Sequence, residues 1–306
     1  MRKRTSRTRV ALAGVAAAVL GLAGCDAGGG GSPAPQGTGS RAAKPAPVWD
    51  RTPDSIAAVG DSITRGFDAC AVLSDCPEVS WATGSDAGVD SLAVRLLGAA
   101  GAARHSWNHA VTGARVADLP DQMARAAAHD PELVTVMVGA NDACRASTAA
   151  MTPVDDFRAD FEKALGTLRA ARPKAQVYVS SVPNLKRLWS EGRTNALGKQ
   201  VWRLGICPSM LADPDDLTSA AALRRDRVQQ RVMAYNRVLA EVCAKDRRCR
   251  FDGNAVYDYD FGTGQLSRWD WFHPSKDGQA RLASIAYRTI TAVKAAATDD
   301  GGRDRP

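Results

Sequence analysis

The apolar positions along the chain fall into two alternating patterns. Short runs of β-branched and other apolar residues recur along the sequence, and the segments between them repeat apolar residues every three or four positions, as helices packed on one side do. The expected strands are 55–59, about 105–110, 133–138, 176–181 and a short one near 250–251. Because strands and helices alternate, we expect a five-stranded, mainly parallel sheet covered by helices on both faces.

The helix after the third strand has the clearest sequence signals. Thr152 suits the N-cap, Pro153 the first helical position and Asp155 the first turn. Periodicity predicts further helices near 92–97, over 118–128 and over 228–242. Ser275 is expected to cap the last helix. The segment 184–218 fits no such unit, and we expect it to be an insertion near the functional site.

The first 24 residues have the composition of an export signal. Five basic residues open the chain, and an uncharged, mostly apolar stretch over 10–23 follows. That stretch is too short to span a bilayer comfortably but suits the apolar region of a signal peptide. It ends in Leu22-Ala23-Gly24-Cys25, which resembles a bacterial lipobox. We therefore expect residues 1–24 to be removed and Cys25 to be lipidated; the alternative is ordinary secretion, in which Cys25 has no role.

The two ends also limit the size of the folded domain. Residues 25–48 are rich in Gly, Ser, Pro and Ala, and residues 298–306 are polar, so we expect a disordered linker and a disordered tail. This leaves 49–297 for one domain. Removing residues 1–24 takes away five basic side chains and no acidic ones, so the net charge falls from +7 to about +2. Since the remaining charges are scattered, we expect no nucleic-acid partner.

When Cys25 is set aside, six of the seven cysteines remain. An even number of cysteines in an exported chain favours disulfides. Six cysteines allow fifteen pairings, and spacing favours one of them: two pairs are separated by only five residues each, and the other two cysteines are left to each other. The expected disulfides are Cys70–Cys76, Cys144–Cys207 and Cys243–Cys249. A metal site is disfavoured because the chain has no Cys-x-x-Cys and no histidine at ligand spacing.

Four short polar motifs lie where they can carry chemistry. Three of them follow predicted strands: Gly60-Asp61-Ser62-Ile63, Thr112-Gly113-Ala114 and Gly139-Ala140-Asn141-Asp142. The fourth, Asp270-Trp271-Phe272-His273-Pro274, comes near the end of the chain. In parallel sheets the active site lies at the carboxyl ends of the strands, so the first three motifs are expected to meet there. A serine after a sharp turn, with a histidine and an aspartate elsewhere, indicates a nucleophile with its base.

In order and spacing, these motifs resemble the four blocks of the SGNH (GDSL) hydrolases, over about residues 55–296. The resemblance implies a three-layer α/β/α, flavodoxin-like fold and ester hydrolysis through a serine acyl-enzyme, without metal or cofactor. Ser62 would be the nucleophile, His273 the base and Asp270 the acid that orients it. The resemblance assigns the oxyanion hole to the backbone N–H groups of Ser62 and Gly113 and the side-chain amide of Asn141.

Some assignments stay open from the sequence. Some members of the family lack a working acid at the position of Asp270, and Asp258 and Asp260 are possible substitutes. The other histidines have no motif around them, and we expect no catalytic role for His105, His109 and His129.

The stretches 66–84 and 108–115 look like the phospholipase-B-like branch of the superfamily, which favours a lipid acyl ester. We expect a monomeric bacterial serine esterase or lipase that is exported and either held to the membrane by a lipid anchor or released. The alternatives are a carbohydrate O-acetylesterase and a non-catalytic lipoprotein that binds a ligand on the same fold.

Overall fold

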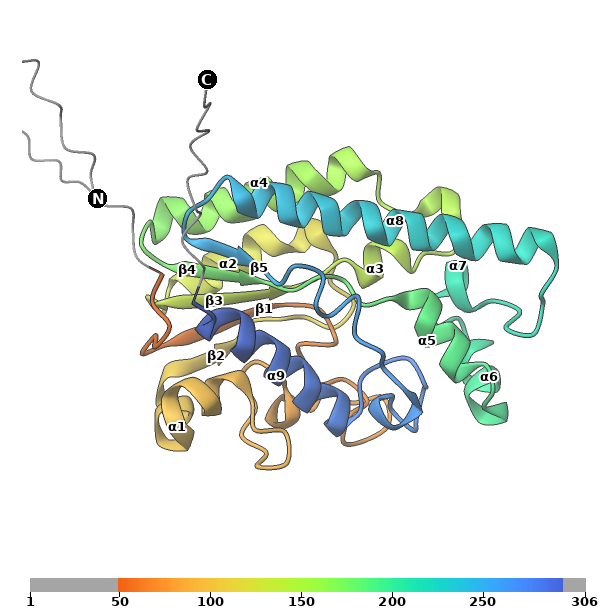
Figure 1. The fold of residues 1–306 in the computed structure, drawn as a ribbon, viewed down its shortest axis with the longest axis horizontal. Helices are drawn as coiled ribbons and strands as arrows, with labels where there is room; N and C mark the ends of the chain where they lie inside the picture. The colour runs from red at the N-terminus through yellow and green to blue at the C-terminus, as the bar shows by residue number, and fades with distance from the viewer. Residues whose placement is uncertain (1–48, 294–306) are drawn as a thin grey trace, which may run out of the picture. The chain divides into compact units, whose positions relative to one another are not determined.

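Five strands form one sheet in the order β2-β1-β3-β4-β5, and all four neighbouring pairs are parallel (Figure 1). The computed structural model describes residues 49–293. The strands are β1 (Ile56–Gly60), β2 (Ser106–Asn108), β3 (Leu133–Met137), β4 (Gln176–Val179) and β5 (Cys249–Phe251). Each lies within two residues of its predicted range. The predicted signal peptide, Cys25, the linker and the tail at 298–306 lie outside the described residues.

Helices cover both faces of the sheet, which makes the three layers that the sequence predicts (Figure 1). On one face lie α1 (Leu92–His105) and α9 (Lys276–Thr291), which contact each other. On the other face lie α2 (Leu119–Ala127), α4 (Val154–Ala171) and α8 (Ser219–Ala244). Shorter elements are α3 (Ala140–Ala143) and the 3₁₀ turns Pro77–Val79, Val116–Asp118, Thr148–Ala150 and Thr263–Gln265.

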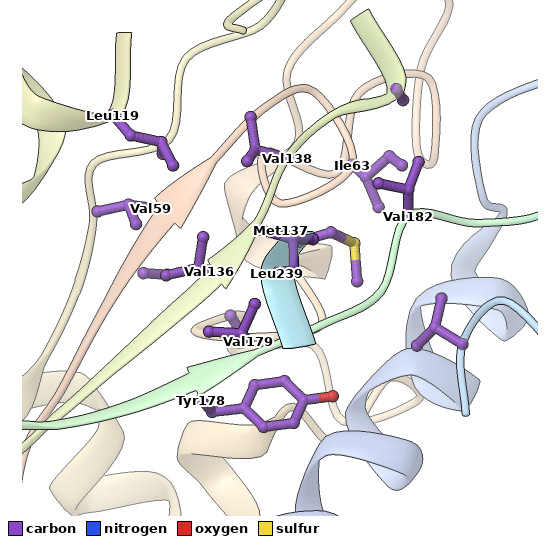
Figure 2. Packing of buried hydrophobic residues seen from close by; sticks show 14 of the residues in the cluster. Val59, Ile63, Leu119, Val136, Met137, Val138, Tyr178, Val179, Val182 and Leu239 are labelled. Atoms are coloured by element: carbon purple, nitrogen blue, oxygen red, sulfur yellow. The ribbon is translucent and has the colours of Figure 1, made fainter. Parts of the chain in front are cut away.

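The three central strands are buried along their whole length. Figure 2 shows side chains from each of them, with Val59 on β1, Val136 on β3 and Val179 on β4. Leu119, the first residue of α2, packs over the same cluster. A strand covered on both faces can be apolar at every position, because neither face meets water. This is why the sequence shows these strands as continuous apolar runs.

The start of α4 differs from the prediction by one position. Pro153 is the N-cap residue and Val154 is the first helical residue, so Thr152 does not cap the helix. Its hydroxyl instead donates to the carboxylate of Asp142 at 2.8 Å, a tertiary partner that competes with the local one. The prediction for the last helix is confirmed, because the side chain of Ser275 caps α9.

The segment 184–218 forms three short helices, α5 (Leu185–Gly192), α6 (Ala196–Trp202) and α7 (Pro208–Leu211). They lie beyond the ends of the strands to which the motifs are attached (Figure 1). A disulfide between Cys144 and Cys207 joins this insertion to the chain just after α3. The other two disulfides are Cys70–Cys76 and Cys243–Cys249, so the pairs are those that the spacing favours. Between residues 49 and 293, no helix is both long enough and apolar enough to cross a bilayer.

Candidate active site

The topology brings three of the four motifs to one place. β1 lies between β2 and β3, so the chain leaves β1 toward one side and later returns to pair on its other side. In open parallel sheets, ligands bind outside the carboxyl ends of strands at such a switch point. Ser62 follows β1, Gly113 follows β2 and Asn141 follows β3. The candidate residues therefore stand at the place that the strand order favours.

The turn that carries Ser62 is fixed by glycine and two glutamines. Gly60 has a φ of 144°, and a Cβ there would meet the carbonyl oxygen of Met137 at 2.1 Å, so only glycine fits. The amide of Gln122 in α2 accepts the Gly60 N–H at 2.7 Å and donates to its carbonyl at 3.0 Å. Gln279 in α9 donates to the carbonyl of Ile63 at 2.9 Å. Both layers of helices thus hold the backbone beside the serine.

Asp270 and His273 share one tight turn. One carboxylate oxygen of Asp270 accepts the backbone N–H groups of Phe272 and His273, each at 2.9 Å. These bonds fold the four residues so that the other oxygen reaches Nδ1 of His273 at 2.5 Å. Trp271, between them, takes the left-handed conformation with a φ of 50°. The three-residue spacing is therefore the spacing that this turn requires.

The fold brings Ser62, His273 and Asp270 into one connected chain of hydrogen bonds. Oγ of Ser62 lies 2.8 Å from Nε2 of His273, and the two residues are 211 positions apart. With the ring proton on Nδ1, the imidazole donates to Asp270 and Nε2 is free to accept the serine proton. Ser62 and Asp270 are buried, and the histidine side chain is 13% exposed. The alternative acid Asp260 is exposed and pairs with Arg187 at 2.6 Å.

The charges around the ring favour its protonated form. Burial opposes a charge on His273, but the hydrogen bond and the charge of Asp270 outweigh it, so the pKa of His273 is raised. Burial also opposes a charge on Asp270, yet the hydrogen bond and charge of His273 hold the pKa of that carboxyl below its ordinary value. The imidazolium that forms when the ring takes a proton is therefore stabilised in place.

The three candidate oxyanion donors stand on neighbouring loops. Among residues 49–293, the backbone N–H groups of Ser62 and Gly113 have no hydrogen-bond acceptor. The amide nitrogen of Asn141 donates to the carbonyl of Ala114 at 3.0 Å, which uses one of its two hydrogens. Gly113 has a φ of 84° and open space where a Cβ would lie, so the backbone conformation, not crowding, favours glycine there.

The sequence model of the GDSL-like lipase/acylhydrolase family matches residues 56–286. The chain belongs to this family. None of the curated proteins compared is a match at the sequence level.

Solved structures with a similar fold include an extracellular lipase from Streptomyces rimosus (17% identity, 78% of this chain and 99% of that chain, TM-score 0.44). A phospholipase A1 from Streptomyces albidoflavus has 19% identity, over 78% of this chain and 99% of that chain, with a TM-score of 0.44. A family 3 carbohydrate esterase from Clostridium thermocellum has 14% identity, over 77% of this chain and 94% of that chain, with a TM-score of 0.45.

The site of this GDSL-family chain also contains residues to which the sequence assigned no role. The ring of Phe67 packs against that of His273 at a tilt of 58°, with the ring centres 5.0 Å apart. Asp61 is buried, and burial raises its pKa to about 7. Asp142 accepts the Val116 N–H at 3.0 Å, and burial raises its pKa to about 6. Both acids belong to recognised motifs, but their burial depends on tertiary packing and leaves no local signal.

Two of the remaining histidines of this GDSL-family chain form an aromatic stack with a tryptophan. His129 stacks between Trp107, at 4.6 Å, and His109, at 5.0 Å. Burial, followed by the charges of His129 and Arg125, lowers the pKa of His109. The prediction that His105, His109 and His129 have no catalytic role stays a prediction, and the stacking gives His109 and His129 a packing role.

Proposed function

We propose that this protein is a serine esterase or lipase that hydrolyses carboxylic esters through an acyl-enzyme on Ser62. The observation that carries the proposal is the chain of contacts from Oγ of Ser62 to Nε2 of His273, at 2.8 Å, and from Nδ1 to Asp270, at 2.5 Å. Serine is a weak nucleophile at neutral pH, and a base within hydrogen-bond distance activates it.

The reaction follows from this geometry. Oγ of Ser62 attacks the carbonyl carbon of the ester while its proton passes to His273, and Asp270 stabilises the imidazolium. The N–H groups of Ser62 and Gly113 and the amide of Asn141 would bind the oxyanion, and removing one such donor costs about 2.7–4 kcal/mol in barrier. The intermediate expels the alcohol, which takes the proton from His273. Water then gives a proton to His273 and attacks the acyl-serine. The bond to Oγ breaks, the acid is released, and Oγ takes the proton from His273, which restores Ser62 and the neutral base.

An acyl lipid is our first choice of substrate because apolar side chains stand exposed on two loops of the site. Val72 and Leu73 are 55% and 78% exposed in the loop closed by Cys70–Cys76, and Val111 is 48% exposed in the loop of Gly113. The hydroxyl of Thr112 donates to Asp75, so the two loops touch. Exposed apolar residues that lie near one another favour an apolar ligand.

A second candidate, removal of acetyl groups from a carbohydrate, is favoured by polar side chains near the same Gly113 loop. A hollow of about 350 Å³ lies beside the Gly113 loop, and its lining includes Asp118, Asp121 and Arg125. Carboxylates and a guanidinium can hydrogen-bond the hydroxyl groups of a sugar. On this reading, the alcohol half of the ester would be polar and the acyl half short.

One experiment tests the activity and separates the two substrates. The domain 49–297 would be given p-nitrophenyl esters from acetate to palmitate, beside Ser62→Ala as the variant that lacks only the nucleophile. We expect hydrolysis by the wild type and a loss of at least a thousandfold in the variant, with no change in thermal midpoint. Preference for medium or long chains would support the lipid substrate, and cleavage of acetate alone would support the deacetylase. Ligand binding without turnover on any ester would instead indicate a binding protein.

We also propose that the protein is exported and held to a membrane through a lipid on Cys25. The basic and apolar opening of the sequence supports this, as do three disulfides in the folded domain, since disulfides persist in oxidising compartments. Mass spectrometry of the protein from its native host tests it. A diacylglyceryl group on an N-terminal Cys25 is expected, and a soluble chain with an unmodified N-terminus elsewhere would refute it.

A further inference from the structure

A second carboxyl group lies beside the Asp270–His273 pair of the candidate site. Asp68 stands in the loop after the nucleophile and is only 2% exposed. A carboxylate oxygen of Asp68, one of Asp270 and a ring nitrogen of His273 all lie within 4.8 Å of one another. Asp68 is not part of any of the four motifs. Its position beside Asp270 and His273 therefore has no explanation in the mechanism described so far.

The position of Asp68 is fixed from several sides. The hydroxyl of Ser267 donates to its carbonyl at 2.7 Å, while the Ser267 N–H donates to the carbonyl of His273, also at 2.7 Å. One residue thus ties the loop to the turn of the base. The carboxylate of Asp68 accepts the N–H of Leu73, and its own N–H donates to Ser74 at 3.0 Å. Its φ of 56° is left-handed, a conformation that surrounding structure must hold for a residue with a side chain.

Two carboxyl groups this close and this buried do not both ionise freely. Burial, followed by the charge of Asp270 and a hydrogen bond with it, raises the pKa of Asp68 to about 6. The pKa of Asp270 is lowered instead, because it faces His273. Of the pair, Asp68 is therefore the group that takes the proton. Asp61, at the end of β1, is the other acid whose charge acts on the His273 ring.

The two states of Asp68 have opposite effects on the base. When protonated, Asp68 donates a hydrogen bond to Asp270 and draws its negative charge away from the ring. When ionised, it adds a second negative charge behind the ring, which favours the imidazolium. We propose that Asp68 is a positioning residue that pairs with Asp270 and thereby sets how tightly His273 holds the proton taken from Ser62. The proposal rests on the proposed function of the site.

The test is an NMR titration of the His273 ring in wild type and in Asp68→Asn. The chain has only four histidines, and the His273 signal is the one missing from His273→Ala. Asparagine keeps the acceptor for Leu73 and a donor for Asp270 but never ionises. We expect the pKa of His273 to fall by about one pH unit, because a charge near the ring is lost. Asp260→Asn, which removes an exposed carboxylate, should leave it unchanged. Equal values in wild type and Asp68→Asn would overturn the proposal.

Kinetics provide a second measure that a merely structural role would not move. In Asp68→Asn the acid limb of the kcat/KM profile should shift by the same amount. At pH values below the acid limb, kcat/KM as a fraction of its plateau value should then be about tenfold higher than in wild type. KM should be unchanged. Loss of activity at every pH, with an unshifted limb, would mean that Asp68 only shapes its loop.

The titration needs no activity, so it separates the two proposals. Absence of hydrolysis in wild type would refute the proposed function while the NMR result still decides the role of Asp68. If Asp68→Asn fails to fold, the titration of the wild-type protein alone tests the proposal. Its His273 signal should move in two steps, the first of them near pH 6 as Asp68 ionises, and a single step would contradict the proposal.

Discussion

The indole N–H of Trp202 donates a hydrogen bond to the backbone carbonyl of Asp270 at 2.8 Å. Trp202 is the last residue of α6, so the insertion holds the turn that carries Asp270 and His273. We predict that Trp202→Phe, which removes this donor from a buried site, lowers the free energy of unfolding by about 1–3 kcal/mol and kcat by up to about tenfold. Urea unfolding and steady-state kinetics measure the two effects.

Trp189→Phe is the matched control. Its indole N–H donates to the carbonyl of Pro214 at 3.2 Å, within the insertion and away from the acid turn. This variant should lose stability to a similar or greater extent, because Trp189 also stacks with Arg225, and its kcat should stay at the wild-type value. Equal losses of kcat in the two variants would show that the Trp202 bond does not act on the acid turn.

On the proposed mechanism, replacing Asp270 should remove most of the activity. In Asp270→Asn the oxygen that accepts the Phe272 and His273 N–H groups is kept, so the turn is expected to fold. The amide cannot hold the ring proton on Nδ1 or stabilise the imidazolium, and the corresponding change in serine proteases costs about 10⁴-fold in kcat. We expect a loss of three to four orders of magnitude, measured on the best p-nitrophenyl ester. The exposed Asp258→Asn serves as the control and should be fully active.

Buried acids should make the protein less stable as the pH rises. The pKa of Asp61 is about 7 in the fold and 3.8 in the unfolded chain, because burial disfavours its charge. Its contribution to stability is therefore complete below pH 3.8 and is lost as the pH rises through about 7. We predict that Asp61→Asn flattens the stability profile between pH 4 and pH 8 by up to about 4 kcal/mol. Urea midpoints across this range measure it, and parallel profiles for the two proteins would contradict it.

The disulfides should contribute unequally. Cys144–Cys207 closes a loop with a sequence separation of 63, against 6 for Cys243–Cys249. On the chain-entropy account, replacing the first pair by alanine should cost about 4 kcal/mol and replacing the second about 2 kcal/mol. Urea unfolding of the two double variants gives the comparison. A larger loss from the short loop would show that native packing, not loop closure, determines the effect.

The sequence predicted the framework of the site because the relevant signals are local. Buried parallel strands show as apolar runs, and the motifs follow them directly. Other features depend on contacts between distant segments. Asp68 meets Asp270 only because of the path of its loop. Arg225 looks like an ordinary surface residue of α8, yet it is 1% exposed and donates to the carbonyl of Asp213 at 2.8 Å. Thr152 has the right residue type for a cap but a better partner in Asp142.

The 211 positions between Ser62 and His273 have a consequence for the newly made protein. Ser62 emerges early during synthesis, but His273 comes after the last strand, near the other end of the chain. A partly made or truncated chain that lacks this end carries an unactivated serine, however well its first strands have folded. On the proposed mechanism, hydrolysis therefore begins only after the chain has been made as far as His273 and that residue has packed against Ser62.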